Sequence, residues 1–152
     1  MNNFLLITKT AWKEPPRARH QLTRALAKEH NIVFVAISKK GKPRIQIEKP
    51  EKNITLITPY WYLNGKYTFR LPLVNELYQK WLFRKIFKQY EDFYVINFDP
   101  SASLIHKYFK NVVYFCNDNF LNPKRSKSIL ITKYIAFTQR IVAKNAKFCV
   151  GV

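Results

Sequence analysis

Polar residues follow three apolar runs of this chain, at the points where buried strands would end. They are Trp12, Lys13, Glu14 and Arg17 after the first run, Asn97 and Asp99 at the end of the second, and Asn117 and Asp118 after the third. Carboxylate and amide groups hydrogen-bond hydroxyl groups well, and a carboxylate can also act as a base. The residue types therefore indicate a site that binds a hydroxyl-rich ligand and could move a proton.

Each of these residues also has a purely structural interpretation. Asp99 could cap a helix, Asn117 and Asp118 could form an Asx-turn, and Trp12 could belong to the core. The choice depends on whether the three strand ends lie at one edge of one sheet.

The stretch of residues 4–30 is the unit that positions the first group. Residues 4–7 form a short apolar run typical of a strand covered on both faces. Pro15 and Pro16 interrupt regular structure, and a helix is expected from Arg17, with an apolar side at Ala18, Leu22, Ala25 and Leu26 and a basic side that includes His20 and Arg24.

The rest of the chain repeats this alternation of strand and helix. Further strands are expected at residues 32–37, 54–57, 93–98, 111–116 and 147–152, and further helices at 74–90, 101–108 and 127–145; residues 38–53 are interpreted as a loop. The order predicts an α/β, Rossmann-like doubly wound domain over residues 1–152, with a mainly parallel six-stranded sheet and helices on both faces. The expected strand order 3-2-1-4-5-6 brings the carboxyl ends of strands one and four together at the switch point.

The expected helix at residues 74–90 does not have a single apolar side. Val74, Leu77 and Trp81 lie on one side of a helical wheel, whereas Phe83 and Ile86 lie roughly opposite. Either the helix is broken near Leu82, or its first half turns its apolar side to something other than the sheet. A core helix and a membrane or partner surface both remain open.

Several enzyme classes have no support because their motifs require glycine. The chain has only three glycines and contains neither GxGxxG, GxxxxGK[ST] nor GxSxG. Spacings typical of metal sites are missing as well. The three histidines are scattered and are expected on helix surfaces, and Cys116 and Cys149 are expected to be buried free thiols.

The net charge of +18 is the most unusual bulk property. It would attract nucleic acid, an anionic membrane or phosphate groups, and charge alone does not choose among them. No apolar run is long enough to cross a bilayer, and the N-terminus lacks the features of a signal peptide, so a cytoplasmic protein is expected.

The pattern from Trp12 to Ala27, W-x-E-x-P-R-x-R-H-Q-L-x-x-A-L-A, is followed by His30 and the strand IVFVAI. Together with the segment VVYFCNDNF at residues 112–120, it resembles the N-terminal domain of bacterial GT-B glycosyltransferases. Within that fold it is similar to the retaining, family-four-like group that builds capsule and other envelope polysaccharides. The chain differs from this group at the glycine-rich loop after strand one, which is TAWKEPPR here.

The resemblance implies an enzyme in which this domain binds the acceptor, a glycan or a lipid-linked sugar. A C-terminal domain would bind the nucleotide-sugar donor, so no cofactor is expected on this domain and it would be inactive alone. Many relatives carry a histidine after strand five, where this chain has Asn117 and Asp118, and Asp118 becomes the candidate for contacting the transferred sugar. A sequence that ends on its sixth strand is expected to be part of a longer protein.

A lipid-linked acceptor would place the domain at the inner face of the membrane. Residues 60–88 combine aromatic and basic side chains suited to an anionic surface, namely Trp61, Lys66, Arg70, Trp81, Arg84 and Lys85. The alternative is that these charges form an ordinary solvated surface over core aromatics. The competing functions are a basic nucleic-acid-binding module and a stand-alone nucleotide-binding domain.

Overall fold

A computed structural model describes residues 1–116 and 128–151. These residues form an eight-stranded sheet in the order β3-β5-β2-β1-β6-β7-β8, with β4 paired to β5. The strands are β1 (Asn3–Ile7), β2 (Asn31–Val35), β3 (Lys39–Lys40), β4 (Arg44–Glu51), β5 (Ile54–Trp61), β6 (Tyr94–Asn97), β7 (Val112–Cys116) and β8 (Phe148–Gly151). The helices are α1 (Ala18–Leu26), α2 (Gly65–Thr68), α3 (Pro72–Tyr90) and α4 (Ile129–Asn145), with a 3₁₀ turn η1 (Ile105–Lys107).

The predicted fold class is confirmed. Every neighbouring pair of strands is parallel except β4 and β5. The six predicted strands correspond to β1, β2, β5, β6, β7 and β8, and their order in the sheet is the expected 3-2-1-4-5-6. The carboxyl ends of β1 and β6 are therefore neighbours, as the candidate site requires.

The prediction of a loop at residues 38–53 was wrong, and the sheet has eight strands instead of six. β3 and β4 occupy that region, and β4 runs antiparallel to β5 as an edge strand. The side chains of β4 are mostly exposed and polar, and it carries Pro50, so it lacks the apolar run of a central strand. β5 continues through Pro59 to Trp61. Proline has no N–H to donate, but Pro59 lies beyond the residues of β5 that pair with β2, so the pairing with β2 loses no hydrogen bond.

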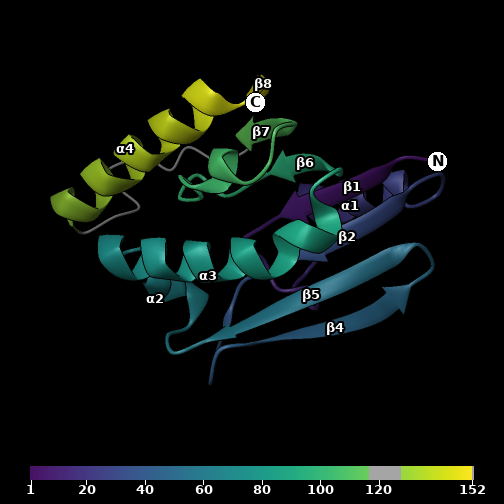
Figure 1. Ribbon diagram of the computed structural model, residues 1–152, viewed down its shortest axis with the longest axis horizontal. Coiled ribbons are helices and arrows are strands. Elements are labelled where there is room, and N and C mark those ends of the chain that lie inside the picture. Colours follow the sequence, from purple (N-terminus) through teal and green to yellow (C-terminus); the bar gives the residue numbers. More distant parts are fainter. Residues whose placement is uncertain (117–127, 152) are drawn as a thin grey trace.

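Helices cover both faces of the sheet (Figure 1). On one face, Leu82, Phe83 and Ile86 of α3 pack against Leu5, Val33 and Val95 of the sheet, together with residues around η1. On the other face, Leu22, Leu26 and Ala27 pack against Leu6, Phe34 and Leu56. α4 lies beside α3, and the N-terminal ends of both helices lie at the carboxyl edge of the sheet (Figure 1).

α3 is a single unbroken helix, which rules out a break near Leu82, and Trp81 is partly buried against the core. The buried positions of its first half are the amides Asn75 and Gln79, whereas Leu73 and Leu77 are 77% and 59% exposed. In its second half the buried positions are apolar, which explains the change of side seen in the sequence. Leu82 belongs to the core.

Three smaller expectations were wrong. α1 buries Arg19, His20 and Thr23 more deeply than Leu22 and Leu26, and it leaves Ala18 and Ala25 exposed, so His20 is not a surface residue. Residues 101–108 form turns and η1 instead of an α-helix. Cys149 is exposed and Cys116 half-buried, although both are free thiols as expected.

Candidate functional site

The loop after β1 is bonded to the end of β2. The backbone N–H and the side-chain hydroxyl of Thr8 both donate to the carbonyl of Val35, at 3.1 and 3.0 Å. The N–H of Ile37 donates to the carbonyl of Thr10 at 3.2 Å. These bonds fix the direction in which residue 9, between the two threonines, leaves the sheet.

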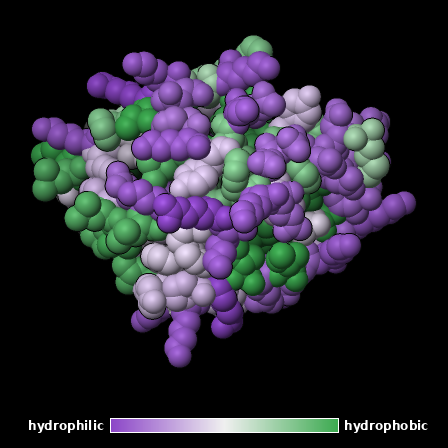
Figure 2. Space-filling view, viewed as in Figure 1, coloured by the Kyte–Doolittle hydropathy of each residue, from purple (hydrophilic) through white to green (hydrophobic). Residues whose placement is uncertain are grey.

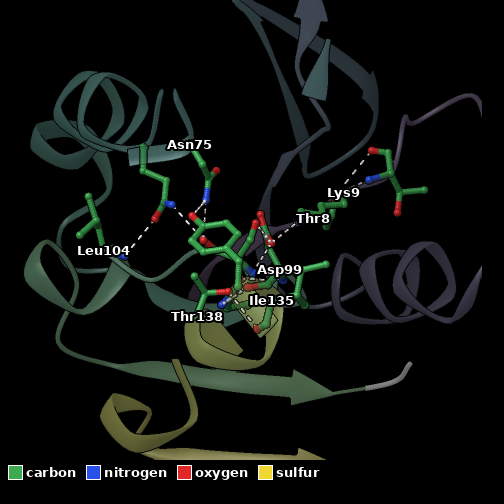
Figure 3. A network of polar contacts seen from close by, with 12 residues as sticks. Thr8, Lys9, Asn75, Asp99, Leu104, Ile135 and Thr138 are labelled. Carbon is green, nitrogen blue, oxygen red and sulfur yellow. Dashed lines mark hydrogen bonds and ion pairs between the residues drawn. The ribbon is translucent and has the colours of Figure 1, made fainter. Parts of the chain in front are cut away.

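Lys9 points from this loop toward Asp99, which follows β6 (Figure 3). Its Nζ lies 3.2 Å from Oδ1 of Asp99, and each side chain is only 17% exposed. The same ammonium group lies 3.5 Å from the centroid of the Phe69 ring, which adds a cation–π contact. Burial lowers the pKa of Lys9 from its ordinary value, Asp99 opposes this effect, and Arg70 adds to it. The pair places a nearly dehydrated cation and anion at the switch point of the sheet, where doubly wound folds bind their ligands.

Asp99 is held by its own neighbours in the chain. The backbone N–H and the hydroxyl of Ser101 both donate to Oδ1 of Asp99 at 2.7 Å. Asn97, fully buried at the end of β6, donates to the Asp99 carbonyl at 3.0 Å and accepts from the Asp99 N–H at 2.9 Å. Asp99 thus makes the turn that its residue type favours and the ion pair at the same time.

Two amides of α3 support this turn from behind. Asn75 and Gln79 both donate to the carbonyl of Ser101, at 3.0 and 2.9 Å, and Gln79 accepts from the N–H of Leu104 at 2.9 Å. Asn75 also donates to the hydroxyl of Tyr134 on α4 (Figure 3). Neither residue was predicted from the sequence, although two amides four positions apart on the inward side of a helix indicate a buried polar contact.

The other predicted residues of the β1 loop are bonded within the loop and to α1. Oε1 of Glu14 accepts from the N–H of Ala11 at 3.1 Å, and Glu14 forms an exposed ion pair with Arg17. Trp12 is half-buried and packs edge-on against Phe34 of the core, as one alternative from the sequence had it. The side chain of Lys13 is exposed. The structure thus joins Asn97 and Asp99 to Lys9, and ties Trp12, Glu14 and Arg17 to the start of α1.

His20 closes the β1 loop onto α1. Its Nδ1 accepts from the N–H of Arg17 at 3.2 Å, which leaves Nε2 to donate to the carbonyl of Ala11, also at 3.2 Å. This assignment requires a neutral ring. Burial is the main cause that lowers the pKa of His20.

The residues predicted to face a membrane lie in two different environments. The rings of Trp61 and Trp81 pack against each other and Tyr78, with centroids 5.1 Å apart for the two tryptophans, and both are half-buried. Lys66, Arg70, Arg84 and Lys85 are exposed. The exposed large apolar side chains of this region are Tyr62, Tyr67, Leu71, Leu73 and Leu77.

Asn117 and Asp118 lie outside the described residues. In the described ranges, no group of three or more His, Cys, Asp or Glu side chains could hold a metal ion. No helix within residues 1–116 or 128–151 has the length and hydropathy needed to cross a bilayer.

Neither the protein-family models nor the curated proteins include a match to this chain. Among solved structures it is similar to an α,α-trehalose-phosphate synthase (UDP-forming) from Burkholderia xenovorans, in complex with glucose-6-phosphate. That match has a TM-score of 0.62 at 12% identity and covers 98% of this chain and 40% of that one. A second similar structure, trehalose-6-phosphate from E. coli bound with UDP-2-fluoro glucose, has a TM-score of 0.55 at 9% identity and covers 97% and 39%.

The likeness confirms the fold that the sequence resemblance implied. Trehalose-phosphate synthases are glycosyltransferases of the GT-B fold, and this chain has the fold of the part that it matches. It spans about 40% of the length of these structures.

Proposed function

We propose that this chain is the acceptor-binding part of a glycosyltransferase, which transfers a sugar from a nucleotide-sugar to a glycan or lipid-linked acceptor. A second, donor-binding domain would complete the enzyme, so the chain alone would be inactive and would bind no cofactor. The observation that carries the proposal is the Lys9–Asp99 pair, a buried charge pair at the switch point of the sheet. A charge pair there offers both an acceptor and a donor of hydrogen bonds to sugar hydroxyls or a phosphate.

The comparisons support this proposal at the level of fold. The two similar structures hold glucose-6-phosphate and UDP-2-fluoro glucose, respectively. The loop after β1 offers no glycine-rich turn for a pyrophosphate, because residues 8–17 contain no glycine. An acceptor therefore fits this domain better than a nucleotide-sugar does. We further propose that this sugar transfer takes place in the cytoplasm and contributes to the synthesis of capsule or other envelope polysaccharides.

Binding measured by NMR on the isotopically labelled chain would test it. Glucose 6-phosphate, used as a probe of sugar and phosphate together, should shift the amide signals of Lys9, Asp99 and Ser101, and Asp99→Asn should weaken the effect. UDP-glucose should leave the same signals in place. Binding of UDP-glucose at these residues would overturn the proposal in favour of a nucleotide-binding domain.

Nucleic-acid binding is the competing function that the charge favours. The guanidinium of Arg44 lies 4.0 Å from the centroid of the Tyr60 ring, and Tyr62 is 64% exposed, so the surface pairs cations with aromatic rings. Gel-shift assays at about 150 mM salt, where purely electrostatic binding is strongly weakened, decide the matter. Tight binding retained at that salt would replace the acceptor-binding proposal.

We also propose that the domain contacts an anionic membrane surface through α2 and α3. Lys66, Arg70 and Arg84 are exposed there together with Leu73 and Leu77. Basic residues near such a surface contribute on the order of 1 kcal/mol each. Co-sedimentation should be stronger with anionic than with neutral vesicles and should fall in a Leu73→Gln, Leu77→Gln variant. Equal recovery on both kinds of vesicle would contradict membrane contact.

A further inference from the structure

An open apolar groove lies between the N-terminal ends of α3 and α4. Its volume is about 550 Å³, and it is lined by Tyr67, Arg70, Leu71 and Pro72 on one side and Ser128, Leu130, Ile131 and Tyr134 on the other. Leu130 is 79% exposed and Leu71 46%. Hydrophobic atoms gather at this end of the molecule, at the left of the view, where α3 and α4 begin (Figure 2). A groove of this size and composition is typical of small-molecule sites.

The groove is joined to the Lys9–Asp99 pair by two residues. Arg70 lines the groove, and its guanidinium lies 5.6 Å from the centroid of the Phe69 ring, while the ammonium group of Lys9 lies 3.5 Å from the same centroid. Tyr134 lines the groove from α4, and its hydroxyl accepts a hydrogen bond from Asn75, which also bonds the carbonyl of Ser101. One end of the groove is thus cationic and borders the candidate site, while the rest is apolar.

We propose that this groove holds the hydrocarbon chain of a phosphate-linked lipid acceptor, with the phosphate against Arg70 and the sugar end at Lys9 and Asp99. This rests on the proposed acceptor-binding function and names its substrate class. Arg70 carries five N–H donors, which suit phosphate oxygens. Burial of an apolar chain in the groove would supply most of the affinity.

A single lipid chain fits the groove better than a protein partner does. The net charge of +18 opposes the close approach of a second copy but attracts an anionic headgroup. A stable protein interface buries about 800 Å² on each partner, whereas the groove is of ligand size. Arg70 is the only cation among the described residues that line the groove, and it lies at one end of the groove. An amphiphile with its negative charge at one end therefore matches the groove.

Calorimetric titration with monomeric farnesyl phosphate tests this proposal. Farnesyl phosphate should bind at least ten times more tightly than farnesol, and inorganic phosphate should bind more weakly than both. Leu130→Gln should weaken binding of farnesyl phosphate and farnesol alike by about tenfold. Arg70→Gln should weaken only farnesyl phosphate, again by about tenfold.

Two matched variants serve as controls. Phe137→Gln alters an exposed apolar side chain of α4 outside the groove lining, and Arg140→Gln removes an exposed arginine of the same helix, so neither should change the affinity. Circular dichroism melts establish that each variant is folded. Equal binding of farnesyl phosphate by the native chain and by folded Leu130→Gln would overturn the proposed groove. An equal loss of binding in Leu130→Gln and Phe137→Gln would also overturn it, because such a loss indicates non-specific adsorption of the lipid to exposed apolar side chains.

The outcomes separate this inference from the proposed function. If glucose 6-phosphate shifts the signals of Lys9 and Asp99 while farnesyl phosphate does not bind, the acceptor is water-soluble and only the lipid groove is wrong. If farnesyl phosphate binds in the groove but no sugar-bearing probe reaches Lys9 and Asp99, the groove holds and acceptor binding by this sheet edge is wrong.

Discussion

Lys9 Nζ and Asp99 Oδ1 lie 3.2 Å apart, and this ion pair joins the loop after β1 to the loop after β6. The two residues are 90 positions apart in the chain, yet neighbouring parallel strands place them together. Phe69, which follows α2, covers the ammonium group from a third direction. The loop after β1, the loop after β6 and the residue that follows α2 therefore meet at this ion pair, although no local sequence pattern predicts the contact.

We expect removal of both partners of this pair to cost less stability than the two single removals added together. Lys9→Met leaves Asp99 buried without its cation, and Asp99→Asn leaves Lys9 without its anion, so each should cost on the order of 3 kcal/mol of unfolding free energy. The double variant should lose less than the sum of the single losses. Urea denaturation of the four proteins measures the coupling; strictly additive losses would mean that the pair contributes nothing as a pair.

Gln79 offers a test of the support behind Asp99. Gln79→Met keeps the size of the side chain but removes the acceptor of the Leu104 N–H and one donor to the Ser101 carbonyl. Because both backbone groups are buried, we expect a loss of about 1–3 kcal/mol. Gln89→Met, an exposed position on the same helix, should change stability by less than about 0.5 kcal/mol. Similar losses in both variants would contradict a specific role of the Gln79 contacts.

The sequence predicted the parallel strands and their order because each central strand is a short apolar run buried on both faces. It did not predict β4, because an edge strand half open to water carries charged and polar residues such as Arg44 and Glu48. The buried face of α1 was also misjudged. His20 is buried by its bonds to Ala11 and Arg17, and such bonds leave no trace in hydrophobic periodicity.

The candidate site was predictable only in part. Asn97 and Asp99 could be identified because strand ends in a doubly wound sheet converge on one edge. Lys9 could not, because a lysine in a loop is ordinarily solvated and its burial depends on Phe69 and Asp99, both remote in the chain. Asp118 and Asn117 stay predictions, since they lie outside the described residues.

Gly65 is expected to resist substitution although it begins a helix. A Cβ at this position would collide with the side chain of Ile37 and lie 3.0 Å from the backbone nitrogen of Ser38. Alanine is the better helix former by about 1 kcal/mol, so local propensity alone predicts a gain. We expect the collision to dominate, and Gly65→Ala to lower the unfolding free energy by about 1–3 kcal/mol. Gly151→Ala, where no atom lies within 4 Å of the new Cβ, is the matched control and should change little.

The pH dependence of stability should depend on the buried His20 and the half-buried His106. Burial lowers the pKa of His20, and burial followed by Lys107 lowers the pKa of His106. In the unfolded chain a histidine titrates near its ordinary value of about 6.5. The unfolded state therefore binds protons more readily, so the stabilisation is complete above about pH 6.5 and is lost as the pH falls through the lower, folded-state values.

Melting temperatures measured between pH 8 and pH 5.5 would test this. We expect the native chain to lose stability on acidification, and His20→Gln to lose less, because glutamine does not titrate. His106→Gln should remove a further part of the slope, and the double variant should have the flattest profile. An unchanged slope in His20→Gln would show that the bonds of its ring to Ala11 and Arg17 do not require the neutral imidazole.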